Sequence, residues 1–340
     1  MQLEKKRATL KDVSKAAGVS IAAVSYVLNN HPMAARIGQE KVELIQKTAK
    51  RLNYRPNQIA KSLKNQKTFT IGLIVADISN PFSASIANYI EDNAKKKGYT
   101  VFFGSSGENL NKTKDLIETM LDRNVDGLIV TPIDNSEPIL KELVPKGFPL
   151  VLVDRFFKSK FDFVGIDNFQ ATYDAIKVFV QNGRSRIGFI SYETELMHIR
   201  KREEGYKKAL EEEGITFQKD LLYRVSLNSI ESDVKSSIDK MLGLSPPCDA
   251  IFFATNTLGY IGIRHLTLRQ IDIPNDLALI SFDKSDFYDF LPFEMTYIKQ
   301  PLQSISIQAL DLLFKQMDSK QSQAKEVVLG AELIIGNSSG

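Results

Sequence analysis

The most constraining feature of this 340-residue chain is an alternation of short apolar runs with amphipathic segments that begins at residue 69. We predict a strand in each apolar run; the runs are residues 71–76, 101–103, 127–130, 150–153, 164–166, 187–190, 251–254 and 277–282. Helices are predicted between them, for example over residues 85–97, 112–123, 172–182 and 200–213. Continuous apolar strands covered by helices on both faces are typical of parallel sheets. The pattern therefore predicts an α/β body with two such sheets.

Charge is unevenly distributed along the chain. Residues 1–68 carry 14 Lys and Arg against 4 Asp and Glu, a net charge of +10, whereas the remainder carries 30 against 37, a net charge of −7. A basic segment on an acidic body indicates that this segment alone binds a polyanion. A solvated basic tail would have the same charge, but this segment also has an apolar pattern that can fold.

Three amphipathic helices are predicted within residues 1–54, which we call the head. Thr9 and Asp12 can form a capping box that starts a helix at Leu10, Gly18 can supply the following turn, and Ser20 can cap a second helix. The apolar stripes that would close a small core are Leu10, Val13 and Ala17, then Val24, Val27 and Leu28, then Val42, Ile45, Ala49 and Leu52. The outward face of the second helix would be Ile21, Ala22, Ser25 and Tyr26. Two short helices joined in this way make an all-α helix-turn-helix unit, whose second helix enters the major groove of DNA.

A short helix is also predicted after the head, in residues 55–68, which we call the hinge. Pro56 suits a first helical turn, and Ile59 and Leu63 lie one turn apart. Two turns fall short of the ~12–15 residues at which an isolated helix becomes marginal in water. We therefore expect this helix to form only against DNA or against the same segment of a second copy.

The head and hinge resemble those of the LacI/GalR family of bacterial transcription regulators. The resemblance rests on TLKDVSKAAGVS at 9–20, VSYVLN at 24–29 and YRPN at 54–57, followed by Leu63. It implies that operator DNA is bound by Thr9, Ser20, Ile21, Ala22, Ser25, Tyr26, Asn29, Asn57 and Leu63. The family wedges its hinge leucine into the minor groove, and packing between two copies is the alternative for Leu63.

The head departs from the family pattern at two residues. Tyr26 stands where relatives often have Arg or His, and Gly38 stands where Ser commonly starts the third helix. Glycine is a tolerable N-cap, so we expect the fold to be kept. Ile21 and Ala22 can contact thymine methyl groups but cannot make the bidentate bonds that select guanine, so base readout is expected to favour A·T steps. Packing against the first helix is the alternative for both residues.

Polar residues follow many of the predicted strands. They are Asp77 with Asn80, Asp154 with Arg155, Asp167, Asn256 and Asp283. Ligands gather at the carboxyl ends of strands in open α/β sheets, so these residues are candidates for a binding site. Each of them taken alone is more often a helix cap or a loop residue than a ligand contact.

The body, residues 69–340, resembles periplasmic sugar-binding proteins and the LacI/GalR effector domain along nearly its whole length. The segments that carry the resemblance are DISNPF at 77–82, VDR at 153–155, REEGY at 202–206 and ISFD at 280–283. It implies a repressor of carbohydrate-utilisation genes whose sugar or sugar-phosphate effector is bound by Asn80, Phe82, Asp154, Arg155, Arg202, Asn256 and Asp283. Arg202 and Asp283 would bind hydroxyls or charged groups, while Phe82 would cover an apolar sugar face. Thr257 replaces an aspartate that many relatives have, and a surface role is the alternative for Arg202.

The family chain crosses three times between two lobes. On that pattern we expect an N-lobe of about residues 69–165 and 296–325, and a C-lobe of about residues 166–295 and 326–340. A helix over residues 302–317 would return to the N-lobe, and the last strand would cover residues 332–335. No leucine-heptad tail follows, so the resemblance implies a homodimer on a pseudo-palindromic operator.

The remaining features argue against other classes of protein. No GxGxxG, Walker, GxSxG or metal-spaced His/Cys pattern is present, and His31, His198 and His265 are scattered, so no enzyme, cofactor or metal site is predicted. The main rival is a periplasmic sugar-binding protein, which the basic head and the lack of an apolar run behind residues 5–7 disfavour. With no stretch of ~20 apolar residues, we expect a cytoplasmic protein without membrane contact.

Overall fold

The computed structural model describes residues 8–29, 31–54, 67–318 and 323–340. The chain divides into two compact units, Met1–Thr68 and Phe69–Gly340. The predicted hinge helix, with Asn57 and Leu63, falls on residues that lie outside the described ranges. Within those ranges, no helix combines the length and the apolar character needed to cross a membrane.

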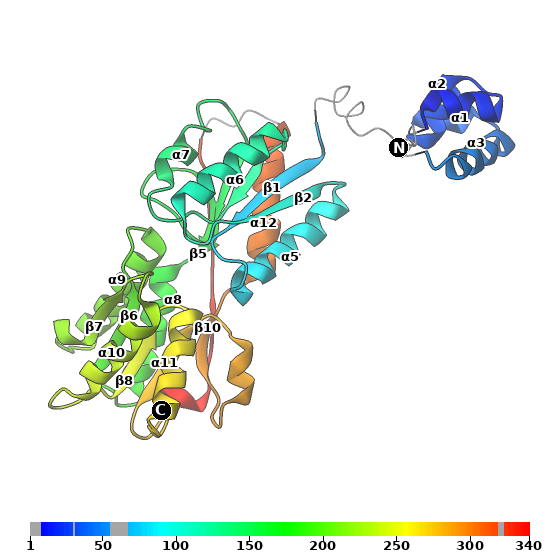
Figure 1. Cartoon of the computed structure of the whole chain (residues 1–340). Helices are drawn as coiled ribbons and strands as arrows, with labels where there is room; N and C mark the ends of the chain where they lie inside the picture. The colour runs from blue at the N-terminus through cyan, green and yellow to red at the C-terminus, as the bar shows by residue number, and fades with distance from the viewer. Residues whose placement is uncertain (1–7, 30, 55–66, 319–322) are drawn as a thin grey trace, which may run out of the picture. The chain divides into compact units, whose positions relative to one another are not determined.

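The described part of the head is helical (Figure 1). Its helices are α1 (Leu10–Ala17), α2 (Ile21–Leu28), the 3-10 helix η1 (Pro32–Arg36) and α3 (Gln39–Arg51). The capping box is confirmed, because the Thr9 hydroxyl accepts from the backbone N–H of Asp12, and the Asp12 carboxylate accepts from the backbone N–H of Thr9 at 2.8 Å. Gly18 ends α1 with a φ of 64°, a left-handed conformation that residues with a Cβ rarely adopt. Ser20 caps α2 through its side chain, whereas Gly38 starts α3 without a side-chain bond.

The core of the head contains every apolar residue of the three predicted stripes. Six are buried, namely Val13, Ala17, Val24, Val27, Ile45 and Ala49, and Leu10, Leu28, Val42 and Leu52 pack against them. Each fully buried large aliphatic side chain of this kind contributes about 1.5–3 kcal/mol relative to an exposed one. This small cluster is what orients α2 against α1 and α3.

The body has two lobes, each with a six-stranded sheet. The N-lobe sheet has the order β11-β5-β4-β3-β1-β2, and the C-lobe sheet has the order β12-β10-β9-β8-β6-β7. The N-lobe strands are β1 (Thr70–Val75), β2 (Thr100–Ser105), β3 (Leu128–Val130), β4 (Leu150–Val153), β5 (Asp162–Ile166) and β11 (Glu326–Leu329). The C-lobe strands are β6 (Ile187–Tyr192), β7 (Leu222–Val225), β8 (Ala250–Phe253), β9 (Ala278–Phe282), β10 (Thr296–Lys299) and β12 (Glu332–Ile334). Among the described strands, β12 pairs antiparallel with β10 and the other pairs are parallel, so the α/β prediction is confirmed.

Helices cover both faces of each sheet (Figure 1). In the N-lobe, α5 (Pro81–Lys96) and α12 (Leu302–Asp318) cover one face, and α6 (Leu110–Asp122) and α7 (Glu137–Lys141) cover the other. In the C-lobe, α8 (Asn168–Gln181) and α9 (Met197–Glu212) cover one face, and α10 (Ile230–Leu242) and α11 (Asn256–Leu268) cover the other. Short 3-10 helices complete the described fold at η2 (Lys219–Leu221), η3 (Asp286–Phe290) and η4 (Asn337–Ser339).

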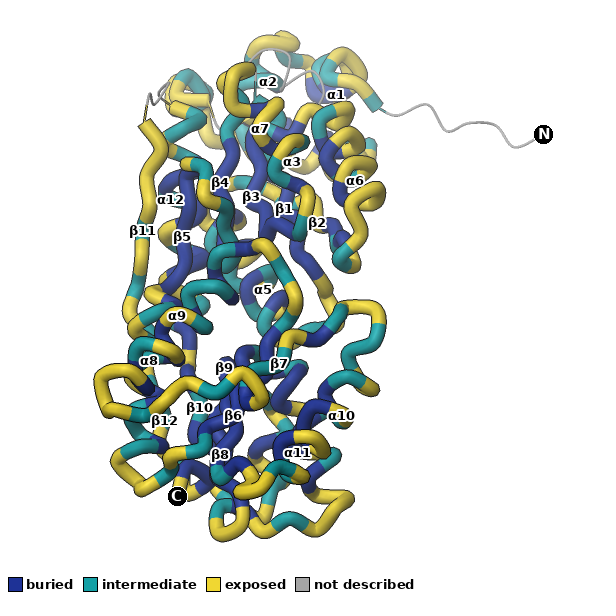
Figure 2. Tube along the Cα trace, turned by 90° about the vertical axis from the view of Figure 1, so that its left-hand side faces the viewer, coloured by how far each residue is buried: buried dark blue, intermediate teal, exposed yellow. Residues whose placement is uncertain are grey.

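Successive residues of the central strands enter different cores. Leu73 belongs to the cluster that includes residues of α5 and α12, whereas Ile74 belongs to the cluster that includes residues of α6 and α7. This two-sided burial explains why the central strands are apolar runs rather than alternating patterns. Figure 2 shows the central strands as buried, and it shows the edge strand β11 with exposed residues.

The expected lobe boundaries need two corrections. The sequence places residues 296–299 in the N-lobe, but they form β10, which pairs with β9 in the C-lobe sheet. It places residues 326–329 in the C-lobe, but they form β11, which pairs with β5 in the N-lobe sheet. Membership of a sheet depends on hydrogen bonding to distant strands, and four-residue strands carry no local mark of it. The chain therefore crosses between lobes after β5, after β10 and after β11.

Candidate functional site

A cavity lies between the two lobes, where the strands of both sheets end. The volume of this cavity is about 140 Å³. All seven residues predicted to bind an effector line it, namely Asn80, Phe82, Asp154, Arg155, Arg202, Asn256 and Asp283. The structure thus brings together residues from distant parts of the sequence. Asp167, another strand-end residue, instead caps α8, because its Oδ1 accepts from the backbone N–H of Gln170 at 2.9 Å.

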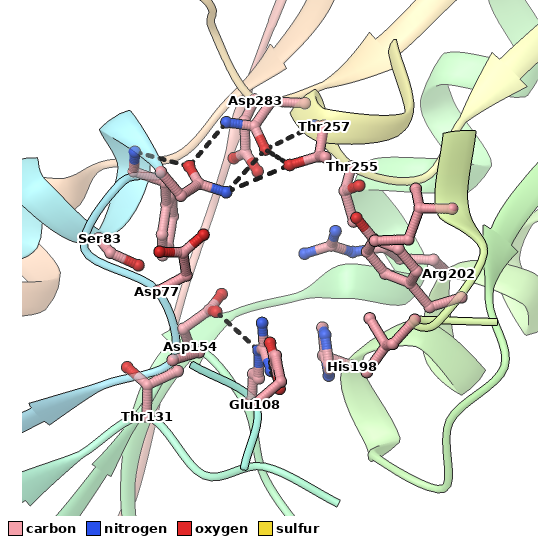
Figure 3. Close-up of a pocket in the computed structure, with 18 residues that line it drawn as sticks. Asp77, Ser83, Glu108, Thr131, Asp154, His198, Arg202, Thr255, Thr257 and Asp283 are labelled. Atoms are coloured by element: carbon pink, nitrogen blue, oxygen red, sulfur yellow. Dashed lines mark hydrogen bonds and ion pairs between the residues drawn. The ribbon is translucent and has the colours of Figure 1, made fainter. Parts of the chain in front are cut away.

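Arg202 extends from α9 into the cavity (Figure 3). Its side chain is fixed, because Nε donates to Oδ1 of Asn168 at 2.8 Å and Nη1 donates to the carbonyl of Ala254 at 2.6 Å. The guanidinium also stacks on Phe282, with Cζ 3.4 Å from the ring centroid. Burial lowers the pKa of Arg202 to about 10, so the side chain stays protonated at neutral pH. A surface role for Arg202 is excluded, since the residue is 2% exposed.

Asp283 follows β9 on the same lobe as Arg202. Its Oδ1 accepts from Nε2 of Gln300 at 2.8 Å, and its backbone has a φ of 67°, which is unusual for a residue other than glycine. Burial raises the pKa of Asp283 to about 6, although the charge of Arg202 opposes this effect. No ion pair joins Arg202 to Asp283 within the described part of the chain. Both groups therefore keep bonding capacity for a ligand.

The N-lobe side of the cavity carries an ion pair. Nη1 of Arg155 lies 2.8 Å from Oε1 of Glu108, and Nε of Arg155 lies 3.7 Å from Oδ2 of Asp154. Burial alone would lower the pKa of Arg155, but Glu108 and Asp154 raise it above its ordinary value. Burial raises the pKa of Asp154, and Arg155 and Arg202 partly offset this rise. Asp154 has a φ of 66°, so a second strained residue borders the same cavity.

Two asparagine side chains join the lobes across the cavity. Asn80 is the N-cap of α5, where its Oδ1 accepts from the backbone N–H of Phe82 at 3.0 Å. The Asn256 side chain donates to Oδ1 of Asn80 at 2.9 Å, and the Asn80 side chain donates to Oδ1 of Asn256 at 3.2 Å. Asn80 is thus both a cap and a contact between lobes, and Phe82 follows it within the first turn of the same helix.

His198 and Glu108 also line the cavity, although the sequence did not indicate them as site residues. His198 precedes Arg202 by four residues on α9, a spacing that puts both on one helix face. His198 is 5% exposed, and its Nδ1 has no hydrogen-bond partner within the described residues. Burial, with the charges of Arg202 and Arg155, holds the pKa of His198 well below its usual value, so the imidazole is neutral. Glu108 follows β2 and could have been found by the same strand-end rule that selected Asp77.

The described DNA-contact residues of the head differ in their surroundings. Ile21 is 47% exposed and Ala22 is exposed, and neither belongs to the head core. The hydroxyls of Thr9 and Ser20 are engaged in helix caps. The Asn29 side chain donates to the Ser25 carbonyl at 2.9 Å. Tyr26 stacks on His31 with ring centroids 4.8 Å apart, a contact that the sequence did not indicate.

Other kinds of site find no support in the described ranges. No group of three His, Cys, Asp or Glu side chains is arranged there to bind a metal ion. Cys248 is 2% exposed, and burial raises the pKa of its thiol to about 12. A thiol of this kind is a poor nucleophile at neutral pH.

Comparison with known proteins assigns each unit to a family model. Residues 9–57 match the model described as "Bacterial regulatory proteins, lacI family", and residues 176–339 match the model described as "Periplasmic binding protein-like domain". The chain is 32% identical over 324 residues to catabolite control protein A of Priestia megaterium, covering 94% of this chain and 96% of that protein. It is 30% identical over 333 residues to the HTH-type transcriptional repressor PurR of Photobacterium profundum, covering 97% of this chain and 98% of that protein. The second of these relatives is a transcriptional repressor by name.

Solved structures share the fold over most or nearly all of the chain. The lac repressor dimer bound to operator and the anti-inducer ONPF matches with a TM-score of 0.82 and 20% identity, covering 98% of this chain and 99% of that chain. A putative ribose operon repressor from Burkholderia thailandensis matches with a TM-score of 0.71 and 25% identity, covering 78% of this chain and 98% of that chain. At such identities the likeness concerns the arrangement of helices and sheets, and the residues of the cavity must be argued from their own geometry.

Proposed function

The chain belongs to the LacI family of bacterial regulatory proteins, and from this premise we propose that it is a repressor of carbohydrate-utilisation genes controlled by a small neutral sugar. Members of this family are DNA-binding transcription regulators. The observation that carries the effector half of the proposal is the cavity between the lobes, where Arg202 and Asp283 face a common space without pairing to each other. A vicinal diol satisfies both, since one hydroxyl accepts from the guanidinium and its neighbour donates to the carboxylate.

The charge balance of the cavity favours a neutral sugar over a sugar phosphate. Four carboxylates line it, those of Asp77, Glu108, Asp154 and Asp283, against the guanidinium groups of Arg155 and Arg202. Arg155 is already paired with Glu108, and His198 is uncharged. A phosphate would add negative charge to a site with a surplus of acidic groups, at a cost that grows in a buried, low-dielectric space.

The head supplies the DNA half of the proposal. In a helix-turn-helix unit the second helix reads base edges, and here the exposed start of α2 carries Ile21 and Ala22. Methyl groups on these side chains suit the thymine methyl, so we propose an operator with A·T steps at these positions. Tyr26 and Asn29, toward the end of the same helix, are the polar candidates for base or phosphate contacts. The hinge residues Asn57 and Leu63 remain part of the proposal as contacts beside the head.

We further propose that the protein acts as a homodimer on a pseudo-palindromic operator. Effector binding favours one arrangement of the lobes, because the ligand contacts residues of both. An effector changes operator affinity only to the extent that it binds the two lobe arrangements with different affinity. The Asn80–Asn256 amide pair is one contact that depends on this arrangement, since it joins α5 of the N-lobe to α11 of the C-lobe.

The test combines sugar binding with DNA binding in one protein preparation. Melting temperature is measured against neutral hexoses and pentoses and against their phosphates, because a ligand of the folded state raises stability by mass action. An operator is selected from a random duplex library, and its affinity is measured by fluorescence anisotropy at several salt concentrations. Phosphate contacts by the head predict that affinity falls as salt rises.

Variants of α9 separate the two activities. Arg202→Ala should abolish the sugar-induced rise in melting temperature and leave operator affinity unchanged. Arg200→Ala is the matched control, because Arg200 is two residues away on the same helix and pairs with Glu195 outside the cavity. A sugar response that survives in Arg202→Ala, or DNA binding that is indifferent to salt, contradicts the corresponding half of the proposal.

A further inference from the structure

A second cavity adjoins the first at the place where the chain crosses between the lobes. The volume of this second cavity is about 450 Å³, and that of the first cavity is about 140 Å³. Its walls come from the start of α5, from the residues after β9, and from the crossing segment between β10 and α12. Phe82 and Asp283 line both cavities, so the two spaces meet at these side chains.

The wall between the two cavities contains polar side chains, and one of their buried oxygen atoms lacks a hydrogen bond. Gln300 borders the second cavity, and its Nε2 donates to Asp283, whose carboxylate also lines the first cavity. Gln300 is 6% exposed, and its Oε1 has no hydrogen-bond partner among the described residues. A buried carbonyl oxygen without a donor has lost the hydrogen bond that water would give it, so a ligand hydroxyl placed here would supply the missing bond.

The lining of the second cavity combines apolar, neutral polar and charged side chains. The charged ones are Lys284, Asp286 and Lys299, and both lysines pair outside the cavity, with Asp289 and Glu332. Aromatic and apolar surface is provided by Phe82, Tyr89 and Leu302, which can cover the apolar face of a pyranose ring. Hydroxyl partners are provided by Gln300, Gln303 and Ser85. The first cavity alone is smaller than the ~300–1,000 Å³ that is usual for ligand sites, whereas the second cavity lies within that range and adds to the space beside the first.

We propose that the effector is a disaccharide or a comparable glycoside, with one ring in the first cavity and the second ring in the cavity beside Gln300. This inference rests on the proposed function, because it takes the first cavity as a sugar site. Asp283 is the shared residue: one oxygen is held by Gln300 toward the second ring, and the other remains for the first ring. A ligand that spans both cavities also touches the crossing segment between β10 and α12.

The experiment compares one-ring and two-ring probes on the full-length protein. Melting temperature and calorimetric affinity are measured with glucose, galactose and ribose, and with cellobiose, maltose, lactose, sucrose and trehalose. We expect at least one of the five disaccharides to bind about tenfold more tightly than every monosaccharide. The filling variant Leu302→Trp should weaken that disaccharide by about tenfold or more and change monosaccharide binding by less than about twofold.

Two further variants keep the test decisive. Gln303→Trp fills the same cavity from an exposed residue, and it replaces Leu302→Trp if the latter lowers the melting temperature without ligand. Val144→Trp, at a residue that is 52% exposed and lines neither cavity, is the control for adding an indole. The inference is overturned, with the proposed function intact, if monosaccharides bind as tightly as disaccharides or if filling weakens both alike. If none of the eight sugars binds the wild type, both the inference and the sugar half of the proposed function fail.

Discussion

At the scale of single residues, the C-lobe side of the cavity carries two charged side chains, Arg202 and Asp283, that do not pair with each other. Arg202 is held rigidly by Asn168, Ala254 and Phe282, so its orientation is set before any ligand arrives. Asp283 has one hydrogen bond from Gln300 and a strained backbone. Groups held in this way cost stability in the empty protein and are retained where binding offsets that cost.

The raised pKa of Asp283 gives a pH-dependent prediction. The pKa of Asp283 in the folded protein is about 6, above the ordinary value of 3.8, so the ionised carboxylate destabilises the ligand-free fold. This loss of folding stability is fully present above about pH 6 and disappears as the pH falls toward 4. Asp283→Asn should therefore raise the melting temperature without ligand at pH 8, by a stabilisation of up to about 3 kcal/mol, and have little effect at pH 4. Thermal unfolding monitored by circular dichroism across this range measures the difference. Asp286→Asn, at an exposed neighbour, is the control, and an equal gain at both pH values would contradict the assignment.

His198 illustrates what sequence reasoning could not reach at this scale. The strand-end rule selected six residues that line one cavity, but His198 lies inside a helix, where that rule does not apply. Its position one turn before Arg202 would have indicated the shared face, provided that Arg202 was already placed in the site. Its burial and its unpartnered Nδ1 depend on the packing of α9 in the folded body, which no local pattern records.

At the scale of elements, apolar stripes predict the helices correctly. The same stripes predict helix starts that lie several residues after the observed ones. The helix predicted over residues 85–97 begins at Pro81, and the helix predicted over residues 172–182 begins at Asn168. In both cases a side chain of the preceding residue caps the helix, Asn80 in α5 and Asp167 in α8. Cap residues precede the first core-facing residue, so a stripe shows the buried part of a helix and not its beginning. The strands predicted from apolar runs are all present. The sequence did not predict β7, β10 and β11, which each contain a charged residue, Arg224, Lys299 and Glu326 respectively.

The capping box of α1 gives a prediction for the head. Thr9→Ala removes the hydroxyl that accepts from the Asp12 backbone, and it should destabilise the head by about 0.5–2 kcal/mol. Hydrogen exchange of the full-length chain, followed at amides of α1 and α2, measures this loss by region. Thr9→Ser is the matched control, because serine keeps the cap. Protection that is lost in α5 or α8 to the same degree as in α1 would contradict a local role for Thr9.

At the scale of the whole molecule, the lobes of the body touch at contacts outside the cavity as well as inside it. The Thr194 hydroxyl donates to Oδ1 of Asp134 at 2.8 Å, and the backbone N–H of Glu195 donates to the same oxygen at 3.1 Å. The backbone N–H of Met197 donates to the carbonyl of Phe156 at 3.0 Å. These bonds join the N-lobe to the segment that leads into α9, the helix that also carries the cavity's guanidinium. A change in the arrangement of the lobes is therefore expected to shift α9 and the cavity residues that it carries.

This linkage predicts that a change far from the ligand alters the response to it. Asp134→Ala removes the acceptor of two bonds between the lobes without altering any residue that lines the first cavity. If the effector favours the arrangement described here, the variant should bind it about 5- to 30-fold more weakly, which corresponds to about 1–2 kcal/mol. The effector concentration needed for half of the maximal change in operator affinity should rise by a similar factor, because coupling between sites is reciprocal.

Asp134→Asn retains an acceptor and should behave nearly as the wild type. Calorimetry measures effector binding, and fluorescence anisotropy measures the response of operator affinity to the effector. Weaker effector binding with an unshifted operator response would contradict the prediction, because this contact would then not belong to the lobe arrangement that controls DNA binding.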